Sequence, residues 1–207
     1  SCEKEENQKI EANRKTLFMY LPWSSNLTNY FYNNISDLEK CITKIGLNNE
    51  KVIVFISTGS TEAMMFEIVS SHGRCKLEIL KKYKSPPFTT IDGITAILND
   101  VKAFAPASVY TMIIGCHGMG WLPVYEMKVR SAPHMKMHWE YQGVPLTRYF
   151  GGLTAEYQTD IKSLASGIAN AGMKMEYILF DDCYMSSIEV AYELKDVTKY
   201  LIGSTSE

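Results

Sequence analysis

The sequence lacks long apolar runs and has no large excess of charge of either sign. A membrane-spanning helix needs about 20 consecutive, mostly apolar residues, and no stretch of the 207 residues has that character. The formal net charge is only −2 at pH 7, so there is no surplus of positive charge to attract a phosphate backbone. These absences argue against a helical membrane protein and against nucleic acid as a partner.

Cysteine is sparse, and metal-binding patterns are missing. The five cysteines are scattered and odd in number, which gives neither a disulfide framework nor a zinc pattern. No Asp/Asn-rich stretch has the spacing of an EF-hand loop. We therefore predict no metal or other cofactor, and we expect most of the cysteines to be small buried hydrophobic residues.

The first residues are polar and charged after a cysteine at position 2. This composition predicts a flexible tether over residues 1–14. A cysteine in this place favours a mature bacterial lipoprotein whose signal peptide was removed at Cys2, which would put the protein in the cell envelope or outside the cell. The alternative is that Ser1 is a cloning remnant and that Cys2 is incidental.

Apolar strands and amphipathic helices alternate along the rest of the chain. Strands are predicted at 16–23, 51–57, 108–116, 173–180 and 197–203, and a β-hairpin at 64–69 and 75–80. Helices are predicted to begin at Ser36, at Thr89 or Thr90, at Asp160 and at Ser186; Ser36 and Ser186 each precede a glutamate by three residues, which is a capping box. This order predicts an α/β fold with a mostly parallel sheet, helices on both faces and an inserted hairpin.

Two strands of this pattern end in residues that can carry chemistry. The apolar run before Asp181 and Asp182 leads into Cys183, ahead of the predicted helix, and the positive end of a helix or a nearby imidazolium favours a thiolate. The strand over residues 108–116 leads into His117 in the same way. Since ligands bind at the carboxyl ends of parallel strands, His117 and Cys183 are predicted to meet there.

Two other residues, His72 and Cys116, also follow apolar strands and have to be considered beside these candidates. His72 also follows an apolar strand, but the flanking strands alternate and resume at once, so we interpret it as a hairpin turn. Cys116 ends an apolar run and is interpreted as a core residue.

The two candidate segments resemble the catalytic segments of the clostripain family of cysteine peptidases, which is related to caspases, gingipains and legumain. The matching residues are His117-Gly118 with Gly120-Trp121, Phe180-Asp181-Asp182-Cys183 with Met185-Ser186, and the closing Gly203-Ser204-Thr205-Ser206-Glu207. The separation of sixty-six residues between His117 and Cys183 is in keeping with the spacing of about 50 in caspases. Asp182 departs from the family, where alanine is usual.

The resemblance implies a caspase-like three-layer α/β/α sandwich over residues 15–207, in a family whose members continue past that point. It implies that Cys183 attacks a peptide carbonyl and that His117 protonates the leaving amine. The backbone N–H groups of Gly118 and Cys183 would stabilise the oxyanion. Trp121 would line the substrate groove or pack under the histidine loop.

Asp181 is the predicted determinant of specificity. Alternation along the strand places it on the same face as Cys183, where a carboxylate would bind a basic P1 side chain. The resemblance also implies cleavage after Arg or Lys. The alternative is that Asp181 caps the helix or pairs with an arginine of the protein.

Residues 122–152 form a long irregular stretch with basic residues at Lys128, Arg130, Lys136 and Arg148. A loop of this length is functional or flexible, and we predict a zymogen that cleaves itself here, with Arg148 preferred. Its partners would be peptide substrates with a basic P1 residue and its own cleaved or C-terminal fragment. His134 and His138 are interpreted as solvated loop residues.

Two alternatives to a peptidase remain open from the residues and the resemblance. The domain could be a non-catalytic, caspase-like adaptor that keeps the Cys–His pair by descent. It could also be a flavodoxin-like binding protein, since residues 22–26 weakly resemble a phosphate loop. Some clostripain relatives need calcium, for which this sequence has no recognisable loop.

Overall fold

The computed structural model describes residues 13–24, 27–119, 149–152, 154–181 and 185–203, with the backbone alone at 117–119. The strands are β1 (Lys15–Leu21), β2 (Glu50–Ser57), β3 (Glu62–Ser71), β4 (Arg74–Lys84), β5 (Val109–Gly115), β6 (His117–Met119), β7 (Tyr149–Gly151), β8 (Gln158–Asp160), β9 (Met175–Asp181) and β10 (Thr198–Ile202). The α-helices are α1 (Thr28–Ile45), α2 (Ile91–Phe104), α3 (Ile161–Asn170) and α4 (Ile188–Leu194). None of the helices in these ranges is long and apolar enough to cross a membrane.

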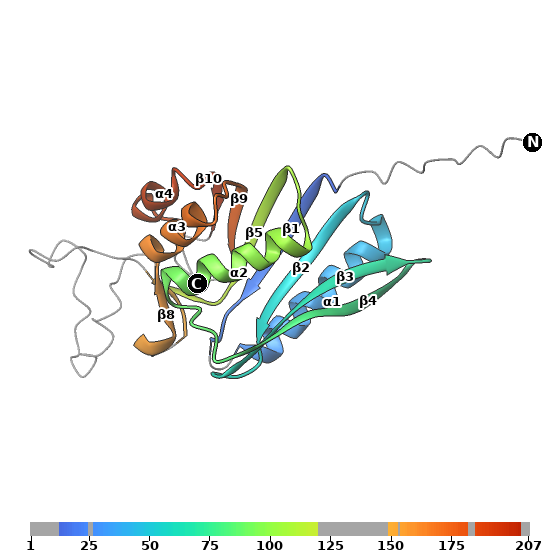
Figure 1. The fold of residues 1–207 in the computed structure, drawn as a ribbon, viewed down its shortest axis with the longest axis horizontal. Coiled ribbons are helices and arrows are strands. Elements are labelled where there is room, and N and C mark those ends of the chain that lie inside the picture. The colour runs from blue at the N-terminus through green and yellow to red at the C-terminus, as the bar shows by residue number, and fades with distance from the viewer. Residues whose placement is uncertain (1–12, 25–26, 120–148, 153, 182–184, 204–207) are drawn as a thin grey trace, which may run out of the picture.

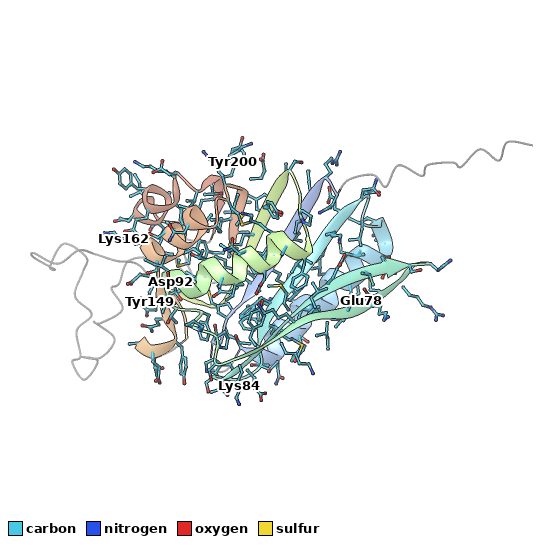
Figure 2. The ribbon with its side chains drawn as sticks, viewed as in Figure 1. Glu78, Lys84, Asp92, Tyr149, Lys162 and Tyr200 are labelled. Atoms are coloured by element: carbon cyan, nitrogen blue, oxygen red, sulfur yellow. The ribbon has the colours of Figure 1, made fainter. Side chains whose placement is uncertain are left out.

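Seven of the described strands form one sheet in the order β10-β9-β5-β1-β2-β3-β4. Neighbours from β10 to β2 run parallel, and β3 and β4 add an antiparallel hairpin. Helices α2 and α3 cross one face and α1 lies on the other (Figure 1). Tyr200 marks the β10 edge and Glu78 the β4 edge (Figure 2). The predicted three-layer sandwich with a mostly parallel sheet and an inserted hairpin is confirmed.

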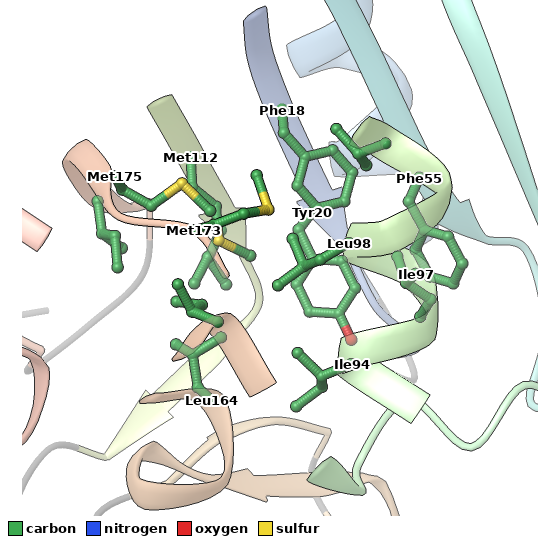
Figure 3. Close-up of a cluster of buried hydrophobic side chains, with 14 of the residues drawn as sticks. Phe18, Tyr20, Phe55, Ile94, Ile97, Leu98, Met112, Leu164, Met173 and Met175 are labelled. Carbon is green, nitrogen blue, oxygen red and sulfur yellow. The ribbon is translucent and has the colours of Figure 1, made fainter. Parts of the chain in front are cut away.

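Strand alternation divides the core between the two faces of the sheet. Phe18 and Tyr20 of β1 pack with α2 and α3, whereas Met19 and Leu21 pack with α1. Helix α2 buries a stripe of Ile94, Ile97, Leu98 and Val101, and Leu98 lies beside Tyr20 in the core (Figure 3). The buried Tyr20 hydroxyl donates a hydrogen bond to the carbonyl oxygen of Phe88, 3.1 Å away, so the core contains no unsatisfied phenol at this point.

The predicted start of α1 is wrong. The helix begins at Thr28, eight residues before Ser36, and Leu27 at its N-cap makes no side-chain capping bond. Phe31 and Ile35 are buried and continue the apolar stripe of Ile42 backwards by whole turns, so burial against the sheet outweighs the local capping signal. At the other end Ile45 is 64% exposed, so the buried stripe of α1 ends at Ile42.

The second capping box is also displaced. The N-cap of α4 is Ser187, whose hydroxyl accepts a hydrogen bond from the Val190 N–H at 3.3 Å, in place of Ser186. The buried residues are Val190 and Leu194, while Ile188 and Tyr192 are exposed. Ile188 and Tyr192 therefore do not contribute to the core side of α4.

A second, three-stranded antiparallel sheet in the order β6-β7-β8 was not predicted. Gly118 of β6 faces Phe150 of β7 in the register. Phe150 is buried and its ring lies 5.9 Å from that of Phe180. This small sheet therefore joins the chain beyond β5 to the end of β9.

Candidate active site

The candidate site lies at the rim formed by the carboxyl ends of the parallel strands. β5 and β9 are hydrogen-bonded neighbours, and their register ends on Gly115 opposite Asp181. His117 follows Gly115 by two residues, and Cys183 follows Asp181 by two. Gly115 and Asp181, which lie opposite each other, are as far apart in the sequence as His117 and Cys183. The two strands that lead to His117 and Cys183 therefore end at the same level of one rim.

The rim also holds the switch point of the sheet. From β1 the chain adds β2 on one side, and it later adds β5 and β9 on the other. In open α/β sheets the crevice for ligands lies outside the carboxyl ends at such a point. β5, which leads into His117, is one of the two strands at this switch point.

Tight packing fixes the approach to His117. A Cβ atom on Gly115 would lie 2.6 Å from Cδ2 of Leu21, so a larger residue would push the strand end away from β1 and α1. Cys116 then turns the chain into β6; it forms no disulfide and is 3% exposed, and its predicted core position is confirmed. The backbone of His117 faces Gly151 across the β6–β7 pair.

The residues on either side of Cys183 are anchored. Phe180 precedes it and Met185 follows it, and both are buried in the core on the α2 side. A Cβ atom on Gly203, just beyond β10, would lie 3.2 Å from the backbone nitrogen of Ser186. β9 ends at Asp181 and α4 begins at Ile188, so the connection between them is short, as the sequence predicted. Phe180 and Met185 anchor its two flanks in the core. Cys183 itself lies outside the described residues.

Asp181 is exposed at the end of β9. Its Oδ2 atom accepts a hydrogen bond from Nδ2 of Asn34 on α1, at 3.0 Å. In the described part of the chain no salt bridge to Asp181 is formed. A partner in α1 was not anticipated, because a single asparagine in a helical segment carries no signal in the sequence.

The remaining predicted residues are placed only in part. Gly118 lies in the middle of β6, and its oxyanion role stays a prediction. Trp121, Asp182 and Arg148, like His134 and His138, lie outside the described residues. Within the described ranges, no group of three or more His, Cys, Asp or Glu side chains could hold a metal ion.

The opposite rim of the sheet carries a different set of groups. A pocket of about 1020 Å³ there is lined by Asn13, Arg14, Asn48, Asn49, Lys51, Pro106, Ala107 and Ser108. His72 occupies the hairpin turn with a φ of 52°. Since β3 runs antiparallel to β2, that turn lies at the amino ends of the parallel strands, away from His117.

Comparison with known proteins agrees with this architecture. The clostripain family profile matches residues 149–207. A clostripain from Bacteroides thetaiotaomicron ATCC 29148, in complex with a peptide inhibitor, is 50% identical with a TM-score of 0.53; the match covers 55% of this chain and 97% of that one. The chain belongs to the clostripain family.

Two further structures match almost the whole of this chain, which in turn covers about half of each. A secreted C11 cysteine protease from B. thetaiotaomicron, iotapain, is 59% identical over 95% of this chain, with a TM-score of 0.83. An inactive zymogen C11 protease from Parabacteroides distasonis is 26% identical over 93%, with a TM-score of 0.71. This chain spans 53% of the first and 49% of the second. A search of curated proteins finds no match.

Proposed function

We propose that the protein is a cysteine endopeptidase in which Cys183 is the nucleophile and His117 the general acid. The observation that carries this proposal is the register of β5 and β9, which ends on Gly115 opposite Asp181. It directs the two segments that follow to one rim. The relatives are cysteine proteases, and a thiol beside an imidazole is suited to nucleophilic attack on a peptide bond.

The reaction follows from the thiol and the imidazole. The thiolate of Cys183 attacks the peptide carbonyl, and the oxyanion that forms is stabilised by the N–H groups of Gly118 and Cys183. As the C–N bond breaks, His117 donates a proton to the amine, which leaves, and a thioester remains. Water then attacks the thioester, His117 accepts its proton, and the carboxylic acid product departs from the sulfur, which leaves the Cys183 thiolate and a protonated His117 as at the start.

The imidazole is the main source of thiolate stabilisation in this proposal. Helix α4 has only 7 residues and begins at Ile188, five residues after Cys183. The N–H of Val190 in its first turn is already bonded to the Ser187 hydroxyl. Because the influence of a helix end falls off within about one turn, we assign α4 the smaller share.

The proposed specificity is for arginine or lysine at P1. An exposed carboxylate at the strand end, two residues before the nucleophile, fits a basic side chain. The inhibitor bound to the B. thetaiotaomicron clostripain is written BTN-VLTK-AOMK, and its peptide letters end in lysine. By likeness, this supports a basic P1 residue here.

We also propose that the enzyme is made as a zymogen and cleaves itself between His117 and Cys183, with Arg148 preferred. One relative is described as an inactive zymogen. The match with the B. thetaiotaomicron clostripain covers 97% of that chain and 55% of this one. In this fold Met119 and Tyr149 face each other in the β6–β7 pair. After a cut between residues 119 and 149, the two fragments would therefore remain joined through this small sheet.

Several further expectations belong to the same proposal. Residues 15–207 would form the peptidase domain, and residues 1–14 a tether that is lipid-anchored through Cys2 on a secreted or envelope protein; one relative is described as secreted. The reaction as written needs no metal, so EDTA should leave turnover intact unless calcium acts as it does in some relatives. The partners would be peptides with a basic P1 residue and the protein's own fragment.

Turnover of reporter peptides tests the proposal. We expect cleavage after arginine and lysine, none after glutamate, and loss of turnover when the thiol is alkylated. Mass spectrometry of the same preparation should show a cut within residues 119–149 that is absent from Cys183→Ala protein. A well-folded wild-type protein that cleaves no peptide would favour the non-catalytic adaptor.

A further inference from the structure

The contact between Asn34 and Asp181 joins α1 to the rim on which the proposed chemistry takes place. The donor is Nδ2 of Asn34 and the acceptor is Oδ2 of Asp181, 3.0 Å apart. The two residues are 147 positions apart in the sequence, so tertiary structure alone creates the pair. Asn34 lies in the second turn of α1, on the side of the helix that faces the end of β9.

The donor to Asp181 is a neutral amide, whereas several other carboxylates described have a cationic partner; Glu156, which accepts a hydrogen bond from the Thr154 hydroxyl at 3.4 Å, also has a neutral donor. Glu50, Glu67, Asp100 and Glu176 lie within 4.0 Å of a lysine or arginine nitrogen. A cationic partner neutralises a carboxylate, whereas the amide of Asn34 orients Asp181 and leaves its negative charge in place.

The geometry also leaves capacity for a ligand. An ionised carboxylate has about four lone-pair sites, and Asn34 is the one described donor to Asp181, acting on Oδ2. The Oδ1 atom and the charge thus remain for a guanidinium or ammonium group. Holding the carboxylate in one rotamer before binding reduces the ordering required when the ligand arrives.

We propose that Asn34 is a positioning residue for recognition of the P1 side chain, because it orients Asp181 without neutralising it. This inference rests on the proposed function. It predicts an effect on the binding of basic substrates, and none on the intrinsic reactivity of the thiol.

Asn34→Lys is the strongest test, because the lysine would place a cation on Asp181. Loss of a hydrogen bond to a charged group is worth about 10- to 100-fold, so kcat/KM for lysyl and arginyl peptides should fall by about that factor. Asn34→Ala removes only the orientation and should raise KM about 2- to 5-fold with kcat unchanged. Asn34→Gln keeps an amide donor and should recover part of the loss.

Asn33→Lys is the matched control, since Asn33 is the exposed neighbour of Asn34 on the same helix and receives the same added charge. It should behave like the wild type. The rate at which uncharged iodoacetamide alkylates Cys183 should be equal in all these variants, which also shows that they are folded. In an Asp181→Asn background, Asn34→Lys should cause no further loss.

Three outcomes would overturn the inference. If Asn34→Lys and Asn33→Lys lose the same fraction of kcat/KM, the effect is general charge repulsion. If Asn34→Lys slows iodoacetamide as much as it slows peptide cleavage, the residue acts on the thiol or on the fold. If the wild type neither cleaves the peptides nor reacts at Cys183, the proposed function falls and takes this inference with it.

Discussion

The two rims of the central sheet contain similar local sequences and differ in what surrounds them. Ser71-His72-Gly73 and Cys116-His117-Gly118 each place a histidine and a glycine after an apolar strand. The strand before His72 runs antiparallel to both of its neighbours, and the strand before His117 runs parallel to both of its own. Only the second histidine therefore reaches a rim where several strand ends and their loops converge. Topology, rather than the local motif, distinguishes them.

The rims also differ in how their charges are balanced. At the amino rim Arg14 lies 3.6 Å from Glu50 and Lys51 lies 3.7 Å from Glu67, so opposite charges are paired within the protein. At the carboxyl rim Asp181 contacts the neutral side chain of Asn34. A charged side chain that is oriented but not neutralised is suited to a ligand, which is the contrast that the following substitutions test.

The largest effect is expected from the cysteines. Cys183→Ala removes the nucleophile, and turnover of a lysyl or arginyl reporter should fall by at least about 1000-fold. Cys75→Ala on the β4 edge strand removes only weak contacts with Thr43 and Glu39 and should keep wild-type kcat. Equal activity of the two variants would contradict the assignment.

The second largest difference in kcat is expected between the two histidine variants. General acid–base catalysis contributes about 100- to 10,000-fold, so His117→Ala should lower kcat within that range. His72→Ala, in the exposed hairpin turn, should leave kcat and KM unchanged. A loss of kcat in the His72 variant comparable to that in the His117 variant would reverse the comparison of the rims.

Removing one negative charge from each rim should separate recognition from surface charge. Asp181→Asn should reduce kcat/KM for basic substrates about 10- to 100-fold, because it removes a charged hydrogen-bond acceptor. Glu50→Gln at the amino rim deletes the same charge and should have no effect on kcat/KM. Selectivity, measured as the ratio between basic and neutral P1 peptides, should collapse only in the first variant.

The smallest effect concerns stability. Gly73 has a φ of 71° in the hairpin turn, and an alanine in this left-handed conformation costs about 1 kcal/mol. Gly73→Ala should lower the free energy of unfolding by about that amount in urea denaturation. It should leave peptide turnover unchanged, because the turn lies at the amino rim. Reduced turnover of the folded variant would show that this rim takes part in function.

Periodicity predicted most of the main sheet and α2, because burial leaves a repeat in the sequence. It failed where a short motif competed with burial. Capping boxes were predicted at Ser36 and Ser186, but α1 begins at Thr28, where Phe31 can be buried against the sheet, and the N-cap of α4 is Ser187. The β6–β7–β8 sheet was missed because strands of 3 residues carry no period.

The candidate site was predictable to the extent that parallel strands place their ends together. The pairing of β5 with β9 follows the predicted order of elements and brings the ends of the two strands that lead to His117 and Cys183 to one rim; that the two side chains meet there stays a prediction. The bond from Asn34 to Asp181 was beyond such reasoning. It joins a helix to a strand 147 residues away, and no local pattern encodes a contact of that range.

The most direct measurement is to treat the wild-type protein with a lysyl or arginyl electrophile and locate the adduct by mass spectrometry. We predict one equivalent of adduct on Cys183, and slower labelling after His117→Ala. The cysteines at positions 41, 75 and 116, which form no disulfide, provide internal competitors. An adduct on one of these, or none on Cys183, would contradict the assignment of the nucleophile.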